Sequence, residues 1–280
     1  MTKYLKINIR NVEIFYREAG DRKNPTILLL HGFPSASHMF RNLIPELENH
    51  FHIIAPDYPG FGNSSSPSRE KFEYTFHNIS TIIESFLEGL EINQYYMFVF
   101  DYGAPIGFRM ALRKPEKVLG IVSQNGNVYE EGLGPKWETR KDFWDNPTNE
   151  KRDSYRTAFS RETIIGQYTE GTKEGSVSPD GYTLDIAYTH NEDYANKQLD
   201  LIFDYQNNIK MYPDFQRYLR ENQPKLLAVW GKNDPSFIYP GAKAFKKDVK
   251  NAVVHLVDSG HFALETHYKE IGKLIRESFK

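Results

Sequence analysis

Asp101, Asp234 and His261 are the residues whose types and order could do covalent chemistry in this chain. Each stands just beyond an apolar run that is typical of a buried strand. Catalytic groups of open α/β sheets gather at the carboxyl ends of the strands, so the three side chains can meet although they are far apart in sequence. Two carboxylates and a histidine that meet in this way can form a triad of nucleophile, acid and histidine, with Asp101 as the candidate nucleophile.

The stretch around Asp101 predicts a sharp turn between a strand and a helix. The aromatic and β-branched run 95–100 ends at Asp101, and a helix-compatible stretch, 106–114, starts shortly after it. Gly103 suits a turn that is too tight for a large side chain. The helix directs free N–H groups and the positive end of its dipole at whatever binds there. This is the geometry of a nucleophile elbow, which usually carries serine, so an aspartate there is informative.

Alternating strand and helix patterns predict the elements that position these residues. We expect strands at 26–30, 51–55, 95–100, 118–123, 226–230 and 253–257, and helices at 37–49, 74–90, 106–114, 241–248 and 264–279. Residues 4–9 and 12–18 alternate like two edge strands joined by a two-residue turn at Arg10 and Asn11. The whole pattern predicts an α/β fold with an open, mostly parallel sheet and helices on both faces.

The stretch between Asn125 and Pro224 breaks this alternation. Charged residues, glycine, asparagine and aromatic residues replace the strand patterns, and nine of the eighteen tyrosines of the chain lie here. We expect a helical insertion. The predicted domains are therefore a core of residues 1–125 and 225–280 and a helical cap of residues 126–224.

The composition of the 280 residues excludes several classes of function. Lys plus Arg (35) nearly balances Asp plus Glu (37), which leaves no electrostatic footprint for nucleic acid or an anionic membrane. The chain has no cysteine, so disulfides, thiolate catalysis and zinc–thiolate sites are excluded, and no apolar run approaches the length of a membrane span. We expect a cytoplasmic protein, a monomer or homodimer without a cofactor or metal, whose partners are a small apolar substrate and water.

Five motifs, in order along the chain, carry a resemblance to a known family. They are His31-Gly32-Phe33-Pro34, the loop 57–64, Asp101-Tyr102-Gly103, Gly231-Lys232-Asn233-Asp234 and Gly260-His261-Phe262. Together they resemble the aspartate-nucleophile branch of the α/β-hydrolase superfamily, which contains epoxide hydrolases and haloalkane dehalogenases. The resemblance covers nearly the whole chain and implies the α/β-hydrolase fold with an inserted cap.

The resemblance also implies a mechanism with an ester intermediate on Asp101. Attack by a carboxylate on an ester carbonyl would give an anhydride, a poor intermediate, whereas attack on a saturated carbon that bears an epoxide oxygen or a halide gives an ordinary ester. His261, oriented by Asp234, then activates water to hydrolyse this ester. The backbone N–H groups of Phe33 and Tyr102 are expected to hold the oxyanion.

The same resemblance implies residues of the cap and of the substrate pocket. Epoxide hydrolases protonate the epoxide oxygen with two cap tyrosines, and the stretch 203–208 is similar to the segment that carries one of them, which points to Tyr205. Tyr155 is expected to be the other, with Tyr168 as the next candidate. The remaining pocket residues are expected to be His31, Pro34, Tyr168 and Phe262, with His31 shaping the loop beside the oxyanion hole rather than acting as a base.

Three functions stay open at this point. Dehalogenases of this kind hold the halide with Trp or Asn N–H donors, and Tyr102 and Phe33 stand in those places here, which favours an epoxide hydrolase. A haloalkane dehalogenase with unusual halide contacts is the alternative. A non-catalytic ligand receptor is disfavoured because the triad is complete. Two of these residues also have a purely structural alternative. Asp101 could serve simply as the cap of a helix, and Tyr205 could serve simply to pack against the core.

Overall fold

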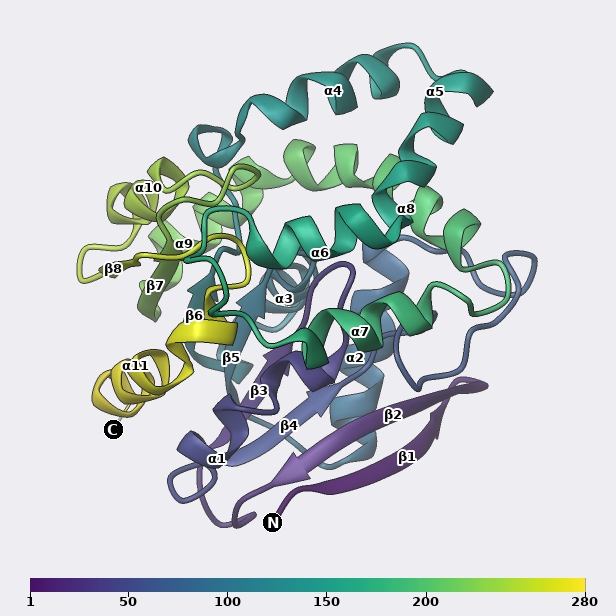
Figure 1. Cartoon of the computed structure of the whole chain (residues 1–280). Coiled ribbons are helices and arrows are strands. Elements are labelled where there is room, and N and C mark those ends of the chain that lie inside the picture. The colour runs from purple at the N-terminus through teal and green to yellow at the C-terminus, as the bar shows by residue number, and fades with distance from the viewer. Residues whose placement is uncertain (280) are drawn as a thin grey trace.

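The computed structural model describes residues 1–279, and the strands in this part of the chain form one eight-stranded sheet (Figure 1). In chain order the strands are β1 (Lys3–Ile9), β2 (Val12–Ala19), β3 (Thr26–Leu30), β4 (His52–Pro56), β5 (Tyr95–Phe100), β6 (Val118–Gln124), β7 (Lys225–Gly231) and β8 (Val253–Val257). Across the sheet the order is β1-β2-β4-β3-β5-β6-β7-β8. The pairs β1–β2 and β2–β4 are antiparallel and all the others are parallel. The prediction of a mostly parallel sheet is confirmed.

A two-residue turn joins β1 and β2, as the sequence predicts. Arg10 and Asn11 have φ angles of 48° and 66°, and the flanking residues Ile9 and Val12 pair across the hairpin. Two consecutive left-handed residues form the turn whose twist matches that of an antiparallel hairpin, and asparagine tolerates this conformation better than most residues do.

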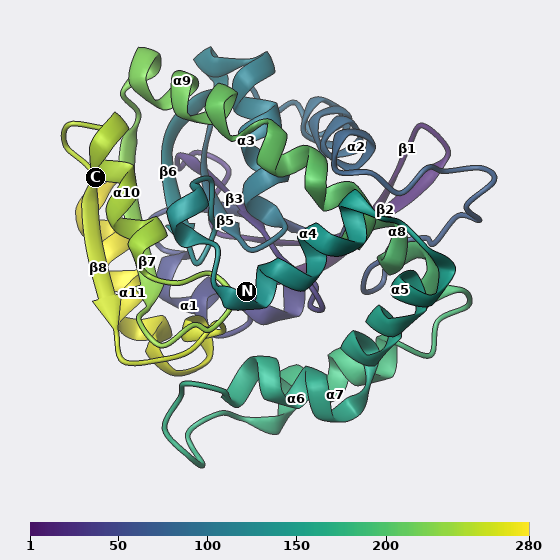
Figure 2. The same cartoon turned by 90° about the horizontal axis from the view of Figure 1, so that it is seen from above.

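Helices cover both faces of the sheet, as predicted. In chain order the α-helices are α1 (Leu43–Leu47), α2 (Phe76–Gly89), α3 (Gly103–Arg113), α4 (Glu138–Asp145), α5 (Asn149–Ser154), α6 (Arg161–Thr169), α7 (Pro179–Tyr188), α8 (Tyr194–Lys210), α9 (Tyr212–Asn222), α10 (Pro240–Asp248) and α11 (Ala263–Ser278). Short 3-10 turns lie at η1 (Ser37–Phe40), η2 (Pro115–Lys117), η3 (Glu130–Gly132), η4 (Pro135–Trp137) and η5 (Tyr155–Phe159). Helices α1 and α11 lie against one face of the sheet, and α2, α3, α9 and α10 lie against the other (Figure 2).

Each face of the sheet has its own hydrophobic core, and β3 shows why the strands are easy to recognise. Side chains of a strand alternate between its faces, so Ile27 and Leu29 belong to the core under α1 and α11, while Leu28 and Leu30 belong to the core under α2 and α3. All four are fully buried. A strand that is buried on both faces needs apolar residues at every position, which gives a continuous apolar run.

Residues 126–224 contribute helices and no strand to the described structure. The sheet stops at Gln124 and resumes at Lys225, and helices α4, α5, α6 and α8 lie above the carboxyl ends of the strands (Figure 1). Helix α9 instead packs against α3, one of the helices that cover the sheet, through aromatic contacts. The division into a core of 1–125 and 225–280 and a cap of 126–224 stays a prediction.

The prediction of a single helix over 37–49 is wrong, because the structure has η1 and then α1 in its place. Pro45 has no N–H for the carbonyl four residues before it, and its ring would collide with that carbonyl, so an α-helix that began at Ser37 could not pass through it. In α1, Pro45 stands in the first turn, where no such bond is needed. The Ser37 N–H instead donates to Asp57 Oδ1 at 2.7 Å.

The elbow between β5 and α3 depends on close contact between two backbones. Asp101 has a φ of 48°, in the left-handed region that costs a non-glycine residue about 1–3 kcal/mol. Helix α3 begins two residues later at Gly103. A Cβ on Gly103 would stand 2.3 Å from the carbonyl oxygen of Leu30 in β3. Because that oxygen belongs to the backbone, it cannot move aside without shifting the elbow.

We predict that Gly103→Ala lowers the free energy of unfolding by about 1–3 kcal/mol, because the added methyl group overpacks the contact between β3 and α3. Gly166→Ala in α6 is the matched control, since a Cβ there meets nothing within 4 Å. Alanine is also the better helix former by about 1 kcal/mol. Urea denaturation measures both variants, and equal stabilities would contradict this account of the elbow.

Candidate active site

Asp101 lies at the carboxyl end of β5 and is 7% exposed. Its Oδ1 accepts a hydrogen bond from the Phe33 N–H at 2.8 Å, and the Tyr102 N–H lies near enough to this carboxylate to lower its pKa. These are the two N–H groups that the resemblance implies as oxyanion donors. Gly32 allows the approach, because a Cβ at that position would stand 2.4 Å from the Cβ of Asp101.

The charge of Asp101 is set by opposing influences. Burial raises the pKa of its carboxyl group, while the positive charge of His261, the N–H groups of Phe33 and Tyr102 and the Arg140 guanidinium lower it. The net direction is upward. A carboxylate that has lost much of its water attacks more readily than one in solution, because fewer hydrogen bonds to solvent must break first.

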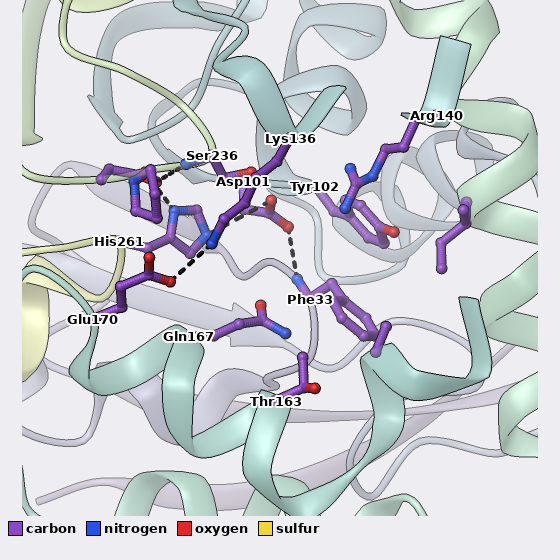
Figure 3. A pocket seen from close by; sticks show the side chains of 14 residues that line it. Phe33, Asp101, Tyr102, Lys136, Arg140, Thr163, Gln167, Glu170, Ser236 and His261 are labelled. Carbon is purple, nitrogen blue, oxygen red and sulfur yellow. Dashed lines mark hydrogen bonds and ion pairs between the residues drawn. The ribbon is translucent and has the colours of Figure 1, made fainter. Parts of the chain in front are cut away.

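His261 links the other two side chains of the predicted triad (Figure 3). Its Nδ1 lies 2.6 Å from Asp234 Oδ2, and its Nε2 lies 3.7 Å from Asp101 Oδ2. The first distance is a hydrogen bond, and the second is too long for one. Because Nδ1 donates to Asp234, Nε2 of the neutral ring carries a lone pair that faces Asp101.

Four hydrogen bonds hold the Asp234 carboxylate. Its Oδ1 accepts from the N–H groups of Ser236 at 2.8 Å and Phe237 at 3.1 Å. Its Oδ2 accepts from His261 and, at 2.7 Å, from Asn125 Nδ2. The Oδ1 of Asn125 in turn accepts a backbone N–H from the end of β7 at 2.9 Å. Sequence reasoning missed Asn125, because its role depends on the pairing of β6 with β7.

The pKa of His261 also reflects opposing influences. Burial lowers it, because the charged ring loses water, but the Asp234 carboxylate and, to a smaller extent, that of Asp101 raise it. The net direction is upward from the ordinary value. His261 is therefore protonated more readily than a histidine in water, because the carboxylate of Asp234 stabilises the charged ring.

His31 shapes the loop after β3 and does not line the cavity. It is fully buried, and its Nε2 accepts from the Tyr58 N–H at 3.2 Å, so its proton lies on Nδ1, 3.1 Å from the carbonyl oxygen of Gly32. Burial lowers the pKa of His31 to about 3, so the ring is neutral. The expected place of His31 in the substrate pocket is therefore corrected.

A cavity of about 170 Å³ opens beside Asp101, between the sheet and the helices of residues 126–224 (Figure 3). The core side is lined by Phe33, Asp101, Tyr102, Asp234, Pro235, Ser236 and His261, and the helical side by Lys136, Arg140, Ala158, Thr163, Gln167, Glu170 and Ile202. An enclosed cavity of about 150 Å³ holds a benzene molecule. This cavity therefore suits a ligand of similar or slightly larger size.

Three other residues expected in the pocket are buried elsewhere. Tyr168 is fully buried, its hydroxyl donates to Asp185 Oδ2 at 2.5 Å, and its ring stacks on that of Phe262 with the centroids 3.8 Å apart. Pro34 is buried in the loop after β3. None of Pro34, Tyr168 and Phe262 lines the cavity. These expectations are corrected, because packing in the interior already occupies the three side chains.

The two expected cap tyrosines do not line the cavity either. The half-buried ring of Tyr155 packs on Phe143, with the centroids 5.4 Å apart. Tyr205 is 1% exposed, and its ring lies 4.7 Å from that of Trp137. Its hydroxyl has no hydrogen-bond partner of good geometry among the described residues. Tyr102, whose ring lies 5.9 Å from that of Tyr205, does line the cavity.

Sequence reasoning missed the polar side chains that enter the cavity from the helical side. Lys136 and Arg140 come from η4 and α4, and Gln167 and Glu170 come from α6 and its end. Lys136 Nζ lies 2.8 Å from Glu170 Oε2 (Figure 3). The signal was the dense run of charges at 136–142, but such a run on a helix usually faces solvent.

Two further findings concern residues 1–279, the part of the chain that the structure describes. No three His, Asp or Glu side chains are grouped there as the ligands of a metal ion would be. No helix there is both long enough and apolar enough to cross a membrane.

Residues 25–268 match the family described as alpha/beta hydrolase fold. The chain belongs to this family. The matched range contains the parallel part of the sheet, the helical segment between β6 and β7, and all three triad positions. The predicted superfamily and the predicted fold are both confirmed.

Named relatives place this α/β hydrolase among enzymes. It is 45% identical over 285 residues to "Uncharacterized hydrolase YNR064C" of Saccharomyces cerevisiae, which covers 100% of this chain and 98% of the relative. It is 34% identical over 126 residues to a haloalkane dehalogenase of Bradyrhizobium diazoefficiens, which covers 43% of this chain and 40% of the relative. The chain is therefore a hydrolase with dehalogenases among its relatives.

Solved structures support the same fold. The haloalkane dehalogenase DbeA from Bradyrhizobium elkani superposes with a TM-score of 0.84 and 22% identity over 99% of this hydrolase and 97% of that chain. Cfl2 from Burkholderia cenocepacia superposes with a TM-score of 0.83 and 19% identity over 100% and 96%. At these identities the likeness shows the fold alone.

We predict that His261 titrates with a pKa above its ordinary value of about 6.5. In Asp234→Asn the pKa should fall below that value, because burial then acts without the raising effect of the carboxylate. The histidine ring signals in an NMR titration of both proteins measure this. The remaining histidine signals report whether the variant is folded, and a pKa that does not fall in the folded variant would contradict the assigned pair.

Proposed function

We propose that this hydrolase opens a small or medium-sized, largely apolar epoxide to a diol through an ester on Asp101. The observation that carries the proposal is the unequal surroundings of the two carboxylate oxygens. Oδ1 is held by the Phe33 N–H, whereas Oδ2 faces His261 Nε2 at 3.7 Å beside the cavity. One oxygen is thus fixed and the other is available for attack, while His261 is placed to act on water afterwards.

In the first step Asp101 Oδ2 attacks an epoxide carbon. A C–O bond forms to the enzyme as the C–O bond of the strained ring breaks, and a phenol gives its proton to the departing oxygen. The product is an ester of Asp101 with a neighbouring free hydroxyl group. No cofactor is needed for this step, because the ionised carboxylate is itself the nucleophile.

In the second step His261 Nε2 takes a proton from water, and the hydroxide attacks Cγ of the Asp101 ester. The oxyanion that forms at Oδ1 stays in contact with the N–H group of Phe33, and we propose that the N–H group of Tyr102 is its second donor. Collapse releases the diol, which takes the proton back from His261. The carboxylic acid left on Asp101 loses its proton, which restores the phenol. Asp234 stabilises the charged ring of His261 during this step.

The tryptophans favour an epoxide over a haloalkane. A halide needs free N–H donors, but each of the three indole N–H groups of the chain is already bonded to a backbone carbonyl. Trp137 donates to Ser236 at 3.0 Å, Trp144 to Ile202 at 3.1 Å, and Trp230 to Phe237 at 2.6 Å. None is therefore available to hold a departing halide.

Haloalkane dehalogenation is the second candidate, because named relatives carry that activity in their names. In this chain a halide would need donors other than the tryptophan N–H groups. Gln167 supplies an amide to the cavity wall and Tyr102 a phenol. This set is unusual for a halide, so we retain dehalogenation as the alternative.

We infer that two phenols, those of Tyr102 and Tyr205, serve as proton donors to the epoxide oxygen. The resemblance points to Tyr205, which does not line the cavity but whose buried hydroxyl has no hydrogen-bond partner of good geometry among the described residues, and such a group is satisfied when a ligand oxygen reaches it. The cavity adds Tyr102, whose side chain lines it next to Asp101. We propose that these two take the roles expected of the cap pair, in place of Tyr155.

The wider organisation belongs to the same proposal. We propose that residues 126–224 act as a cap that closes the cavity over Asp101, since half of the cavity wall comes from this segment. A cytoplasmic location and a monomeric or dimeric state stay predictions.

We predict that His261→Gln, mixed with a reactive epoxide, gains the mass of one substrate molecule on Asp101, because the ester forms but is not hydrolysed. Intact-protein mass spectrometry followed by peptide mapping detects it. Asp101→Asn under the same conditions should gain no mass. A His261→Gln protein that turns over epoxide without any adduct would contradict the proposal, and an adduct in neither protein with any epoxide would favour a ligand receptor.

We predict that Tyr102→Phe or Tyr205→Phe slows ester formation from an epoxide by a factor of about one hundred to ten thousand, or by less where the second phenol still donates. Tyr205→Phe should leave the reaction with a bromoalkane nearly unaffected, because bromide leaves without a proton, whereas Tyr102→Phe should slow that reaction only where the Tyr102 phenol holds the halide. Single-turnover kinetics with both substrates measure this. Wild-type epoxide rates in both variants and in the double variant would show that neither phenol is the donor.

A further inference from the structure

Arg140 enters the cavity from α4 without an acidic partner. Its side chain lines the cavity that also contains Asp101, and it points towards Tyr102 (Figure 3). The guanidinium carbon lies 4.2 Å from the ring centre of Trp137. Among the residues that the structure describes, the Arg140 guanidinium forms no ion pair and no hydrogen bond. It is held by stacking on Trp137.

The neighbouring cations show how unusual this is. Lys136, in the same wall, pairs with Glu170 at 2.8 Å, and Lys141, the next residue along α4, pairs with Glu138 at 3.2 Å. Stacking on an aromatic ring uses the face of the guanidinium and leaves the five N–H donors in its plane unused. Arg140 therefore presents a charge and a planar set of donors to the cavity.

The charge of Arg140 acts on the reacting groups. It lowers the pKa of Asp101 and that of the Tyr102 phenol against the stronger effect of burial, which raises both. Arg140 therefore lies close enough to influence the nucleophile electrostatically. A ligand group of opposite charge bound at Arg140 would lie inside the same cavity as the bond to be broken.

We propose that the substrate carries a carboxylate and that Arg140 binds it, so that the preferred substrate is an epoxy acid. This rests on the proposed function and sharpens its substrate class. The fork of a guanidinium matches the planar carboxylate with two parallel hydrogen bonds, and such charge-assisted bonds are stronger than bonds between neutral groups. The positive charge also offsets the repulsion that a second carboxylate would meet from Asp101.

The size of the cavity fits such a molecule. About 170 Å³ holds a ligand slightly larger than benzene. A six-carbon acid with an epoxide at its far end is of this size. Its carboxylate would occupy the Arg140 side of the cavity while its epoxide lies against Asp101, and its carbon chain would contact Phe33, Ala158 and Ile202, which are apolar lining residues.

The test compares an epoxyhexanoate that has a terminal epoxide with the uncharged epoxyhexanamide of the same length. The wild type should show the higher kcat/KM with the acid. Arg140→Gln should lower kcat/KM for the acid about ten- to one hundred-fold more than for the amide, mainly through KM, because only the acid loses an ion pair. Lys141→Gln is the matched control, since it removes a cation of the same helix that lies outside the cavity wall, and it should change neither value.

Other outcomes overturn the proposal. If Arg140→Gln lowers kcat for the acid and the amide alike, Arg140 acts on the reacting oxygen and not on a substrate carboxylate. If it changes neither substrate, Arg140 only packs on Trp137. Equal kcat/KM values for the acid and the amide in the wild type would exclude the carboxylate as a recognition group.

A binding measurement separates failure of this proposal from failure of the proposed function. Calorimetry with hexanoate and hexanamide measures binding without turnover. Hexanoate should bind the wild type, whereas hexanamide should not. In Arg140→Gln the affinity for hexanoate should fall about ten-fold or more. Arg140-dependent binding of hexanoate by a protein that opens no epoxide would refute the epoxide hydrolase and keep the carboxylate site. Epoxide opening without that binding would refute the carboxylate site and keep the hydrolase.

Discussion

The hydrogen bond from the Phe33 N–H to Asp101 Oδ1 is the contact on which the site depends. It exists because β3 and β5 are neighbours and end at the same edge of the sheet, and because glycines at 32 and 103 let the loop and the elbow touch. With Oδ1 held in this way, Oδ2 is directed at His261. The positive φ of Asp101 is the local strain that this arrangement requires.

Much of this could be predicted from the sequence because the sheet is buried on both faces. Continuous apolar runs such as 27–30 have few alternatives to a central strand, and the polar residues that follow such runs must then lie at one edge of the sheet. Asp101, Asp234 and His261 could therefore be named from the amino-acid sequence alone. The proposed reaction class also rests on physical chemistry, since an ionised carboxylate that acts as a nucleophile favours attack on saturated carbon.

What could not be predicted depends on contacts between segments far apart in the chain. Nothing near Tyr155 in sequence shows that its ring packs on Phe143 rather than facing the cavity. Asn125 and Arg140 have ordinary surroundings in sequence, and they matter only because β7 lies beside β6 and because α4 lies over the cavity. The interrupted helix is a different case, because Pro45 alone was sufficient reason to expect it.

The central claim is that Asp101 supplies the oxygen of the new hydroxyl group, and a single turnover in water enriched in oxygen-18 tests it most directly. With enzyme in excess over epoxide, the diol of the first turnover should contain no label, while the label appears in the side chain of Asp101. This follows because water attacks Cγ of the ester and not the substrate carbon. A labelled diol with an unlabelled Asp101 would show that water attacks the epoxide directly, and would contradict the account.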